Sequence, residues 1–253
     1  ASLCCIRLKI GIICVIHFPE SESENTMEKQ FHGQASESLR LGLLLAVVGG
    51  FLEAYTFLSR GGVFANCETG NLVLLGLYLA QGQMVRAMTY LPPILAFFCG
   101  VLLTNSIRRR AAFHPRLHWR QITVLFEAAC LAAVAFIPYG RWENIAVTAL
   151  VSFACSIQVQ SFRKVHGSAY ATTMCTGNLR SAADNLYAGL ALHDAPALLR
   201  ASRYLSVVLV FVLGAVAGAF LTQALAEKAV LLCTLPLLAA FGVMFLPTGE
   251  AAP

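Results

Sequence analysis

Long apolar stretches, separated by short polar and basic segments, dominate the chain from residue 39 onward. An α-helix needs about 20 apolar residues to cross the roughly 30 Å hydrocarbon core of a bilayer. Six stretches approach that length, and each is predicted to be a transmembrane helix: Leu39–Ser59, Tyr90–Ile107, Gln121–Pro138, Ile145–Phe162, Tyr204–Gln223 and Val230–Leu246. The pattern therefore predicts an all-α fold, a polytopic membrane helix bundle.

Two further apolar pieces do not suit a full crossing. The helical part of Phe64–Gln81 begins at the TGN triplet of residues 69–71 and has 13 residues, which gives about 20 Å at the α-helical rise. The second piece, Tyr170–Leu192, carries Arg180 and Asp184, and charged side chains are costly in lipid. We therefore expect both pieces to be short, re-entrant helices that enter and leave the bilayer on one side.

An internal duplication relates these two pieces. The run TGNL at residues 69–72 recurs at residues 176–179, an offset of 107 residues. Further along, FFCG at residues 97–100 resembles FVLG at residues 211–214, at an offset of 114 residues. Because the repeated triplet begins the helical part of both short apolar pieces, we expect a two-fold internal repeat with a small insertion.

The duplication divides the chain into four parts: an N-terminal extension (1–38) predicted to be disordered, membrane repeat 1 (39–138), membrane repeat 2 (139–247) and a C-terminal tail (248–253). The first methionine is Met27, so we expect translation to start there. A short membrane-surface anchor formed by residues 1–18 is the alternative.

Basic residues orient the predicted spans, because cytoplasmic loops carry an excess of Lys and Arg. With both TGN pieces re-entrant and the N-terminus cytoplasmic, eleven basic residues lie inside: Lys29, Arg40, Arg108, Arg109, Arg110, Arg116, Arg120, Arg163, Lys164, Arg200 and Arg203. Four lie outside: Arg60, Arg86, Arg141 and Lys228. If both pieces crossed fully, the best orientation would place nine inside and six outside. The bias favours three spans in each repeat, which makes the repeats inverted and both termini cytoplasmic.

Composition agrees with a membrane location. Hydrophobic residues make up 58% of the 253 residues and charged residues 12%, against roughly 45–50% and 25% in soluble domains. The net charge of +5 lies in short runs between apolar stretches, where it orients a membrane protein, so no nucleic-acid partner is expected. The nine cysteines form no CxxC pair, and we expect no metal, no cofactor and no disulfide framework. The expected partners are membrane lipid and a small solute, and a homo-oligomer is compatible with the pattern.

The paired triplets are the first candidates for function. A helix N-terminus leaves four N–H groups unpaired and carries roughly half a positive charge, and broken helices with such ends line the substrate sites of many transporters. We expect a midplane site for a small polar or anionic solute, formed by Thr69, Gly70, Asn71, Thr176, Gly177 and Asn178. The alternative is that Thr and Gly only pack helices closely while Asn satisfies backbone groups.

Glu53 is the second candidate, because it lies well inside the first predicted span. A charged carboxylate at that depth is costly, so it faces the bundle interior, is protonated or has a partner. The offset of 107 residues makes Gln160 its counterpart. The two are predicted to couple protons or bind a cation, and a hydrogen bond between neighbouring helices is the alternative.

Other ionisable residues are predicted to lie near the membrane surface. Arg180 and Asp184 are four residues apart on one helix face, and they are expected to form a gate, or an ion pair at a solvated mouth. Glu127 is expected to pair with Arg120 by extending toward the headgroups.

The residues around the triplets resemble a known family. The stretches GGFLEAYTF (49–57), RGGVFAN (60–66) and TGN (69–71), with TTMCTGNLRS (172–181) in the second half, resemble the YoaK family of bacterial multi-pass membrane proteins. The resemblance covers about residues 39–246. It implies a bacterial membrane protein with several spans, and it supplies no reaction, because the family is a domain of unknown function.

These features favour a small-solute secondary transporter or channel-like permease of the bacterial inner membrane. No P-loop, HExxH or GxSxG motif occurs in the sequence, so ATP-driven pumping and these hydrolase chemistries are not expected, and no catalytic residue is assigned. Two alternatives remain open: a non-transporting membrane scaffold that binds a partner protein, and an intramembrane enzyme acting on a lipid or quinone.

Overall fold

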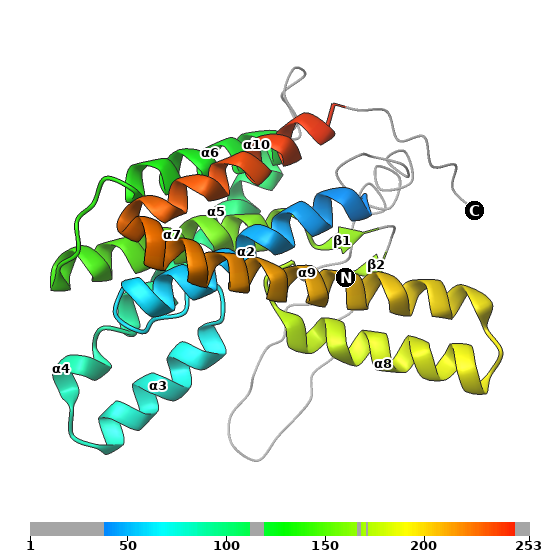
Figure 1. The fold of residues 1–253 in the computed structure, drawn as a ribbon, viewed down its shortest axis with the longest axis horizontal. Helices are drawn as coiled ribbons and strands as arrows, with labels where there is room; N and C mark the ends of the chain where they lie inside the picture. The colour runs from blue at the N-terminus through cyan, green and yellow to red at the C-terminus, as the bar shows by residue number, and fades with distance from the viewer. Residues whose placement is uncertain (1–37, 112–118, 166–167, 171, 246–253) are drawn as a thin grey trace, which may run out of the picture.

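A computed structural model describes residues 38–111, 119–165, 168–170 and 172–245, which form a helical bundle with one short antiparallel β-hairpin (Figure 1). The elements in chain order are α2 (Leu39–Ser59), α3 (Glu68–Ala80), α4 (Met84–Ala87), α5 (Leu91–Ala111), α6 (Trp119–Val134), α7 (Arg141–Ser161), β1 (Lys164–Val165), β2 (Ser168–Ala169), α8 (Cys175–Ala191), α9 (Ala195–Leu225), the 3₁₀ helix η2 (Ala226–Cys233) and α10 (Thr234–Val243). The predicted membrane helix bundle is confirmed. The predicted extension, up to residue 37, and the predicted tail at 248–253 lie outside the described residues.

Within the described residues, four helical segments are long and apolar enough to cross a membrane: Leu39–Ser59, Met84–Arg108, Arg141–Ser161 and Ala195–Val243. The first has the bounds that hydropathy predicts. The last includes the predicted crossing at 204–223, within α9, and most of the predicted crossing at 230–246, which begins inside η2. The predicted crossing at 121–138 is the 16-residue helix α6, which is about 24 Å long.

Local signals set the ends of two long helices. Ser38 caps α2, because its hydroxyl accepts a hydrogen bond from the Leu41 N–H at 3.3 Å. Asp194 caps α9 in the same way, accepting from the Ala197 N–H at 3.3 Å. After α9 the backbone of Ala226 is left-handed, with φ at 54°. The chain reverses there, and α10 returns to pack on α2 and α6.

The packing of the helices repeats between the two halves. α2 packs along α9 and α5 packs along α7; α6 contacts α7 and α10 contacts α2; α8 contacts α9 and α3 contacts α5. Exchanging α2 with α7, α3 with α8, α5 with α9 and α6 with α10 converts each of these contacts into another of the same set. In Figure 1, α2 and α7 run in opposite directions along the bundle. The packing thus has an inverted two-fold repeat. The two most extensive packing pairs, α2 with α9 and α5 with α7, each join a helix of one repeat to a helix of the other.

Glycines allow the two longest of these packing pairs to cross closely. A Cβ atom on Gly50 of α2 would overlap the carbonyl oxygen of Phe211 on α9, and one on Gly218 would lie 2.6 Å from the carbonyl oxygen of Phe51. In the equivalent pair, a Cβ on Gly100 of α5 would lie 2.8 Å from a carbonyl oxygen of α7. Small residues let membrane helices approach to backbone contact, and glycine provides this close approach at both crossings.

Candidate functional site

The first re-entrant turn, residues 60–67, returns the chain to the middle of α2. The Asn66 N–H donates a hydrogen bond to Glu53 Oε1 at 3.0 Å, and Asn66 Nδ2 donates to the Gly49 carbonyl oxygen at 3.3 Å. Gly49 and Glu53 lie in the central turns of α2, well before its end at Ser59. Gly61, with φ at 91°, adopts the left-handed backbone that this reversal requires. The segment after α2 therefore penetrates to the level of the helix midpoint.

The same turn also contacts the middle of α7. Ser152, near the centre of that helix, donates from its hydroxyl to the Ala65 carbonyl oxygen at 2.9 Å. Side chains from two antiparallel spans thus satisfy backbone groups of one turn. Irregular backbone at membrane depth is tolerated only where protein or enclosed water surrounds it, and α2 and α7 supply that enclosure.

Asn71, the last residue of the first triplet, holds this turn closed. Its Oδ1 accepts from the Phe64 N–H at 2.9 Å, while its Nδ2 donates to the Phe64 carbonyl oxygen at 2.7 Å and to Glu68 Oε2 at 2.9 Å. These bonds occupy its polar side-chain atoms. Gly70 packs against the Phe64 ring and Thr69 is exposed on the bundle surface. The side chains of this triplet shape the turn, and they do not provide the free polar groups expected of a solute site.

The second re-entrant turn, between α7 and α8, reaches the same level. A Cβ atom on Gly49 of α2 would lie 3.0 Å from Thr173 Cγ2 and 3.3 Å from the Thr172 carbonyl oxygen. Both turns therefore contact Gly49, one through its carbonyl oxygen and the other across its Cα. From this meeting point α3 and α8 extend toward different ends of the bundle (Figure 1).

In the second triplet only the asparagine lies inside the protein. Asn178 is buried, whereas Thr176 and Gly177 are exposed, and a Cβ on Gly177 would meet no atom within 4 Å. The threonines of both triplets thus face outward. The expectation that all six triplet residues bind solute is not what this geometry favours.

Carboxyl groups are concentrated around the two turns. Glu53 on α2 and Glu127 on α6 are 7% and 1% exposed, and Glu68 opens α3 beside the first turn. Among the residues that the structure describes, no Lys, Arg or His forms an ion pair with any of the three. In the described part of the protein, Glu53, Glu68 and Glu127 thus form an acidic layer with no cationic partner, which is unusual in a protein interior because a buried charge is normally paired.

Several buried oxygen atoms at this level lack a hydrogen-bond partner in the described part of the chain: Glu53 Oε2, Asn66 Oδ1, Glu68 Oε1 and Thr173 Oγ1. They belong to α2, the first turn, α3 and the second turn. Buried acceptors are normally satisfied, and leaving one unpaired costs about 1–3 kcal/mol. The atoms left over are acceptors or a hydroxyl, so this layer suits a group that donates hydrogen bonds or carries positive charge.

Gln158, and not Gln160, faces the second turn. Gln158 is 2% exposed and its amide lies 3.3 Å from Thr172 Oγ1. Gln160 instead donates to Asn105 Oδ1 on α5 at 2.6 Å, on the exposed side of α7. Two residues along an α-helix rotate a side chain by about 200°, so the repeat offset identified the correct helix but the wrong face. The polar α7 residue that faces the second turn is therefore Gln158, and the coupling role of Glu53 and Gln160 stays a prediction.

Glu127 also departs from its predicted position. The expected pair with Arg120 at the membrane surface is absent from the described contacts, and the carboxyl faces Gln158 of α7. With the amide oriented so that its nitrogen faces the carboxylate, Gln158 Nε2 donates to Glu127 Oε1 at 2.7 Å and to Oε2 at 2.8 Å. α6 packs on both α7 and α10, and this packing turns Glu127 into the bundle.

Arg180 and Asp184 lie apart from the two turns. They form an i, i+4 ion pair at 3.9 Å on the surface of α8, and their side chains are 85% and 72% exposed. Such exposed pairs contribute little to stability, and the gate role remains a prediction.

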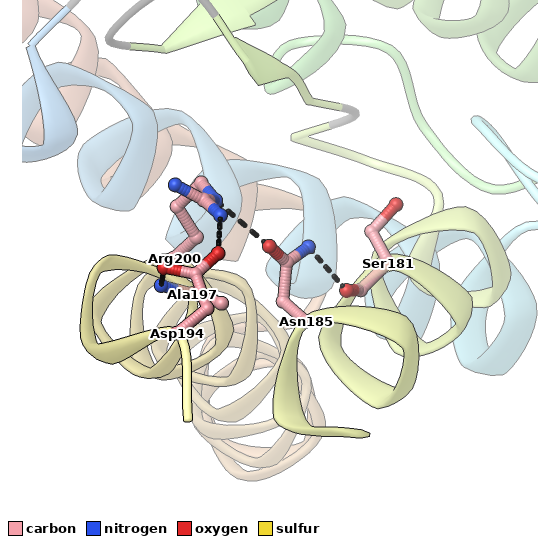
Figure 2. Close-up of polar contacts among 5 residues, drawn as sticks. All are labelled: Ser181, Asn185, Asp194, Ala197 and Arg200. Carbon is pink, nitrogen blue, oxygen red and sulfur yellow. Dashed lines mark hydrogen bonds and ion pairs between the residues drawn. The ribbon is translucent and has the colours of Figure 1, made fainter. Parts of the chain in front are cut away.

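A separate polar cluster joins the second half of α8 to the start of α9 (Figure 2). Arg200 donates to Asn185 Oδ1 at 2.8 Å and pairs with Asp194 at 3.0 Å, while Asn185 Nδ2 donates to the Ser181 carbonyl oxygen at 2.8 Å. Asp194 also caps α9. The cluster closes the hairpin of the two helices and leaves the central layer untouched.

Arg60 is a buried cation that the charge count placed in an outer loop. It is 1% exposed, and its guanidinium bonds Tyr55 Oη at 2.8 and 3.0 Å, the Ile137 and Pro138 carbonyl oxygens at 2.9 and 3.1 Å, and Asn144 Oδ1 at 3.3 Å. Every acceptor is neutral. The side chain ties the end of α2 to the loop between α6 and α7.

Replacing Arg60 tests this tie. Arg60→Met is expected to destabilise the protein by about 3 kcal/mol or more, because buried carbonyl acceptors lose their donors. Arg60→Lys is expected to recover little, because an ammonium cannot reproduce the guanidinium fork. Thermal unfolding in detergent measures both, with Arg141→Met, at an exposed arginine, as the control. Equal melting temperatures for Arg60→Met and Arg141→Met would contradict the tie.

Within the residues that the structure describes, no group of three or more His, Cys, Asp and Glu side chains is placed to hold a metal ion. In the described part of the layer around the two turns, the unpaired atoms are instead two carboxyl oxygens, from Glu53 and Glu68, with the Asn66 amide oxygen and the Thr173 hydroxyl oxygen. Oxygen donors of this kind suit hard cations and ammonium groups.

Comparison with known proteins agrees with this architecture. The family described as "Protein of unknown function (DUF1275)" matches residues 41–243. The chain belongs to this family. A curated relative, the "UPF0700 transmembrane protein YoaK" of Bacillus subtilis (strain 168), is 29% identical over 150 residues, covering 56% of this chain and 64% of the relative. The match therefore spans slightly less than two thirds of that relative's length. No solved structure matches.

The DUF1275 segment runs from the start of α2 to the end of α10, so it includes both re-entrant turns and the three carboxyl groups. The predicted resemblance to the YoaK family is confirmed, and the relative's description supports a membrane location. Neither description assigns a reaction or a solute.

Proposed function

We propose that the protein is a secondary transporter or channel-like permease for a small polar solute. One observation carries this proposal: two re-entrant turns meet at Gly49, where buried oxygen atoms of Glu53, Asn66 and Thr173 have no hydrogen-bond partner among the described residues. A purely structural bundle gains nothing from unpaired acceptors at membrane depth, whereas a solute that donates hydrogen bonds would satisfy them.

The carboxyl groups beside the first turn limit the class of solute that can bind there. Glu53 and Glu68 both border the first turn, and no basic side chain among the described residues pairs with either. An anion would meet repulsion there, so the anionic solute considered from the sequence is disfavoured. A neutral polar molecule or a small cation, such as an amine, matches the acceptors better.

The inverted repeat provides a route for alternating access. Each turn follows a different one of two antiparallel helices, α2 and α7, so the site can open first past one turn and then past the other. We place the protein in the bacterial inner membrane with both termini cytoplasmic, on the basis of the excess of Lys and Arg on that side.

Flux across purified proteoliposomes tests the proposal. Vesicles with and without the protein are exposed to gradients of urea, glycerol or ethanolamine, and the relaxation of vesicle volume is followed by stopped-flow light scattering. Faster relaxation with at least one probe, dependent on the protein, supports permeation. Rates equal to protein-free vesicles for every probe would overturn the proposal in favour of a scaffold or an intramembrane enzyme.

A further inference from the structure

The contacts of Glu127 carry an inference that rests on the proposed transport function and names its coupling ion. Glu127 lies in the middle of α6 and is 1% exposed. Its only hydrogen-bonding neighbour among the described residues is the Gln158 amide of α7, and Gln158 in turn lies 3.3 Å from Thr172 Oγ1 in the second re-entrant turn. The three side chains form one line from α6 to the turn.

The heavy-atom positions of this line allow a hydrogen-bonded arrangement in each of two protonation states, with two bonds to the carboxyl group when it is ionised and one when it is protonated. With Glu127 ionised, the Gln158 nitrogen donates to both carboxylate oxygens, at 2.7 and 2.8 Å, and the Gln158 oxygen accepts from the Thr172 hydroxyl at 3.3 Å. With Glu127 protonated, the amide is turned over: its oxygen accepts from the carboxylic O–H, and its nitrogen donates to Thr172 Oγ1. Binding one proton at Glu127 therefore reverses the hydrogen bond at Thr172.

We propose that Glu127 binds the proton that couples to solute movement. When Glu127 gains or loses this proton, the Gln158 amide reverses its hydrogen bond to Thr172 in the second re-entrant turn. When Glu127 is ionised, the Thr172 hydroxyl hydrogen is held by Gln158. When Glu127 is protonated, that hydrogen is free to bond elsewhere in the layer, where Thr172 and Thr173 pack against Gly49. The solute site thus meets a different donor in each state.

The surroundings of Glu127 favour a proton over a larger ion. Among the residues that the structure describes, the titratable groups that face it are thiols: Cys155 on α7, Cys233 at the end of η2, and Cys130 on its own helix. α10 contains no titratable residue, and the Cys99 and Arg108 side chains of α5 are exposed. A single carboxyl among thiols and one amide lacks the several oxygen ligands that a metal cation requires, whereas a proton needs only one.

Infrared difference spectroscopy tests proton binding without any solute. Purified protein in lipid is titrated with acid, and the carbonyl stretch of a protonated carboxylic acid is followed. We expect a band that is lost in Glu127→Gln and kept in Glu143→Gln, the matched change at an exposed carboxylate. In Gln158→Leu the band should remain, with proton affinity raised about tenfold, because the ionised form loses two charge-assisted hydrogen bonds. A band unchanged in Glu127→Gln would overturn the inference.

Coupling is measured separately in proteoliposomes loaded with a pH-sensitive dye. A solute gradient is expected to drive proton movement with the wild type and with Glu143→Gln, but not with Glu127→Gln or Gln158→Leu. Solute flux without any driven proton movement in the wild type would overturn the coupling role. The infrared titration and the flux assay also distinguish failure of the proton site from failure of the transport proposal. A Glu127 band together with no flux of any probe would contradict transport and support the proton site.

Discussion

Gly50→Leu is expected to abolish assembly of the bundle. A Cβ at Gly50 would overlap the Phe211 carbonyl oxygen and lie 2.9 Å from the Ala215 nitrogen, both backbone atoms of α9. Neither can rotate away, so a larger side chain must separate α2 from α9, the helix along which it packs. Overpacking a core typically costs 1–3 kcal/mol even where side chains can adjust, and the loss here is expected to exceed that range.

Size-exclusion chromatography of fluorescently tagged protein in detergent measures this effect. Gly50→Leu is expected to give aggregate, and Gly50→Ala a folded peak with a clearly lowered melting temperature. Gly76→Ala on α3 is the matched control, because a Cβ there would meet no atom within 4 Å, and it should behave as wild type. A monodisperse Gly50→Leu protein with wild-type melting would show that α2 and α9 do not cross at this glycine.

Hydropathy predicts the helices of this protein well because only long, apolar segments can cross the lipid. α2 has its predicted bounds, Leu39–Ser59, since a polar cap precedes it and a glycine pair follows it. The short first TGN helix was predicted at 13 residues and α3 has 13, because too few apolar residues are available for a crossing. The length and polarity of a segment are local properties, so they can be read from the sequence.

Burial inside the bundle is less readable, because it depends on which neighbour covers which face. Arg120 lies seven residues before Glu127, two helical turns away on the same side, so an ion pair at the surface was a natural expectation. The packing of α6 against α7 and α10 decides otherwise. Arg60 is similar: its position after a span predicts a loop charge, and its burial depends on carbonyl groups about 77 residues later in the chain.

The internal repeat locates the site more reliably than it assigns single residues. The offset of 107 residues correctly related α2 to α7 and the two turns to each other, yet the polar residue facing the second turn is Gln158, and not the aligned Gln160. The offset changes to 114 residues further along, so insertions shift the register. A shift of one or two residues is harmless in a hydropathy profile and decisive on a helix face.

Glu53→Gln is expected to reduce solute flux by at least about tenfold while leaving the fold intact. The amide oxygen of glutamine can still accept from the Asn66 N–H, the contact that Glu53 Oε1 makes at 3.0 Å, so the turn keeps its position. The change replaces the unpartnered Oε2 with an NH₂ group, which donates where a solute needs an acceptor. A loss of about 1.4 kcal/mol of interaction, one good hydrogen bond, corresponds to that factor.

The expected loss is specific to the central layer. Glu143→Gln removes the same charge from an exposed position at the start of α7 and should transport as wild type. Glu53→Ala is expected to lose both flux and stability, because the Asn66 N–H is left without its acceptor. If Glu53→Gln vesicles relaxed as fast as wild type for every transported probe, with equal protein incorporation, the unpaired carboxyl oxygen would have no part in the solute path. The solute path would then have to be sought away from Glu53.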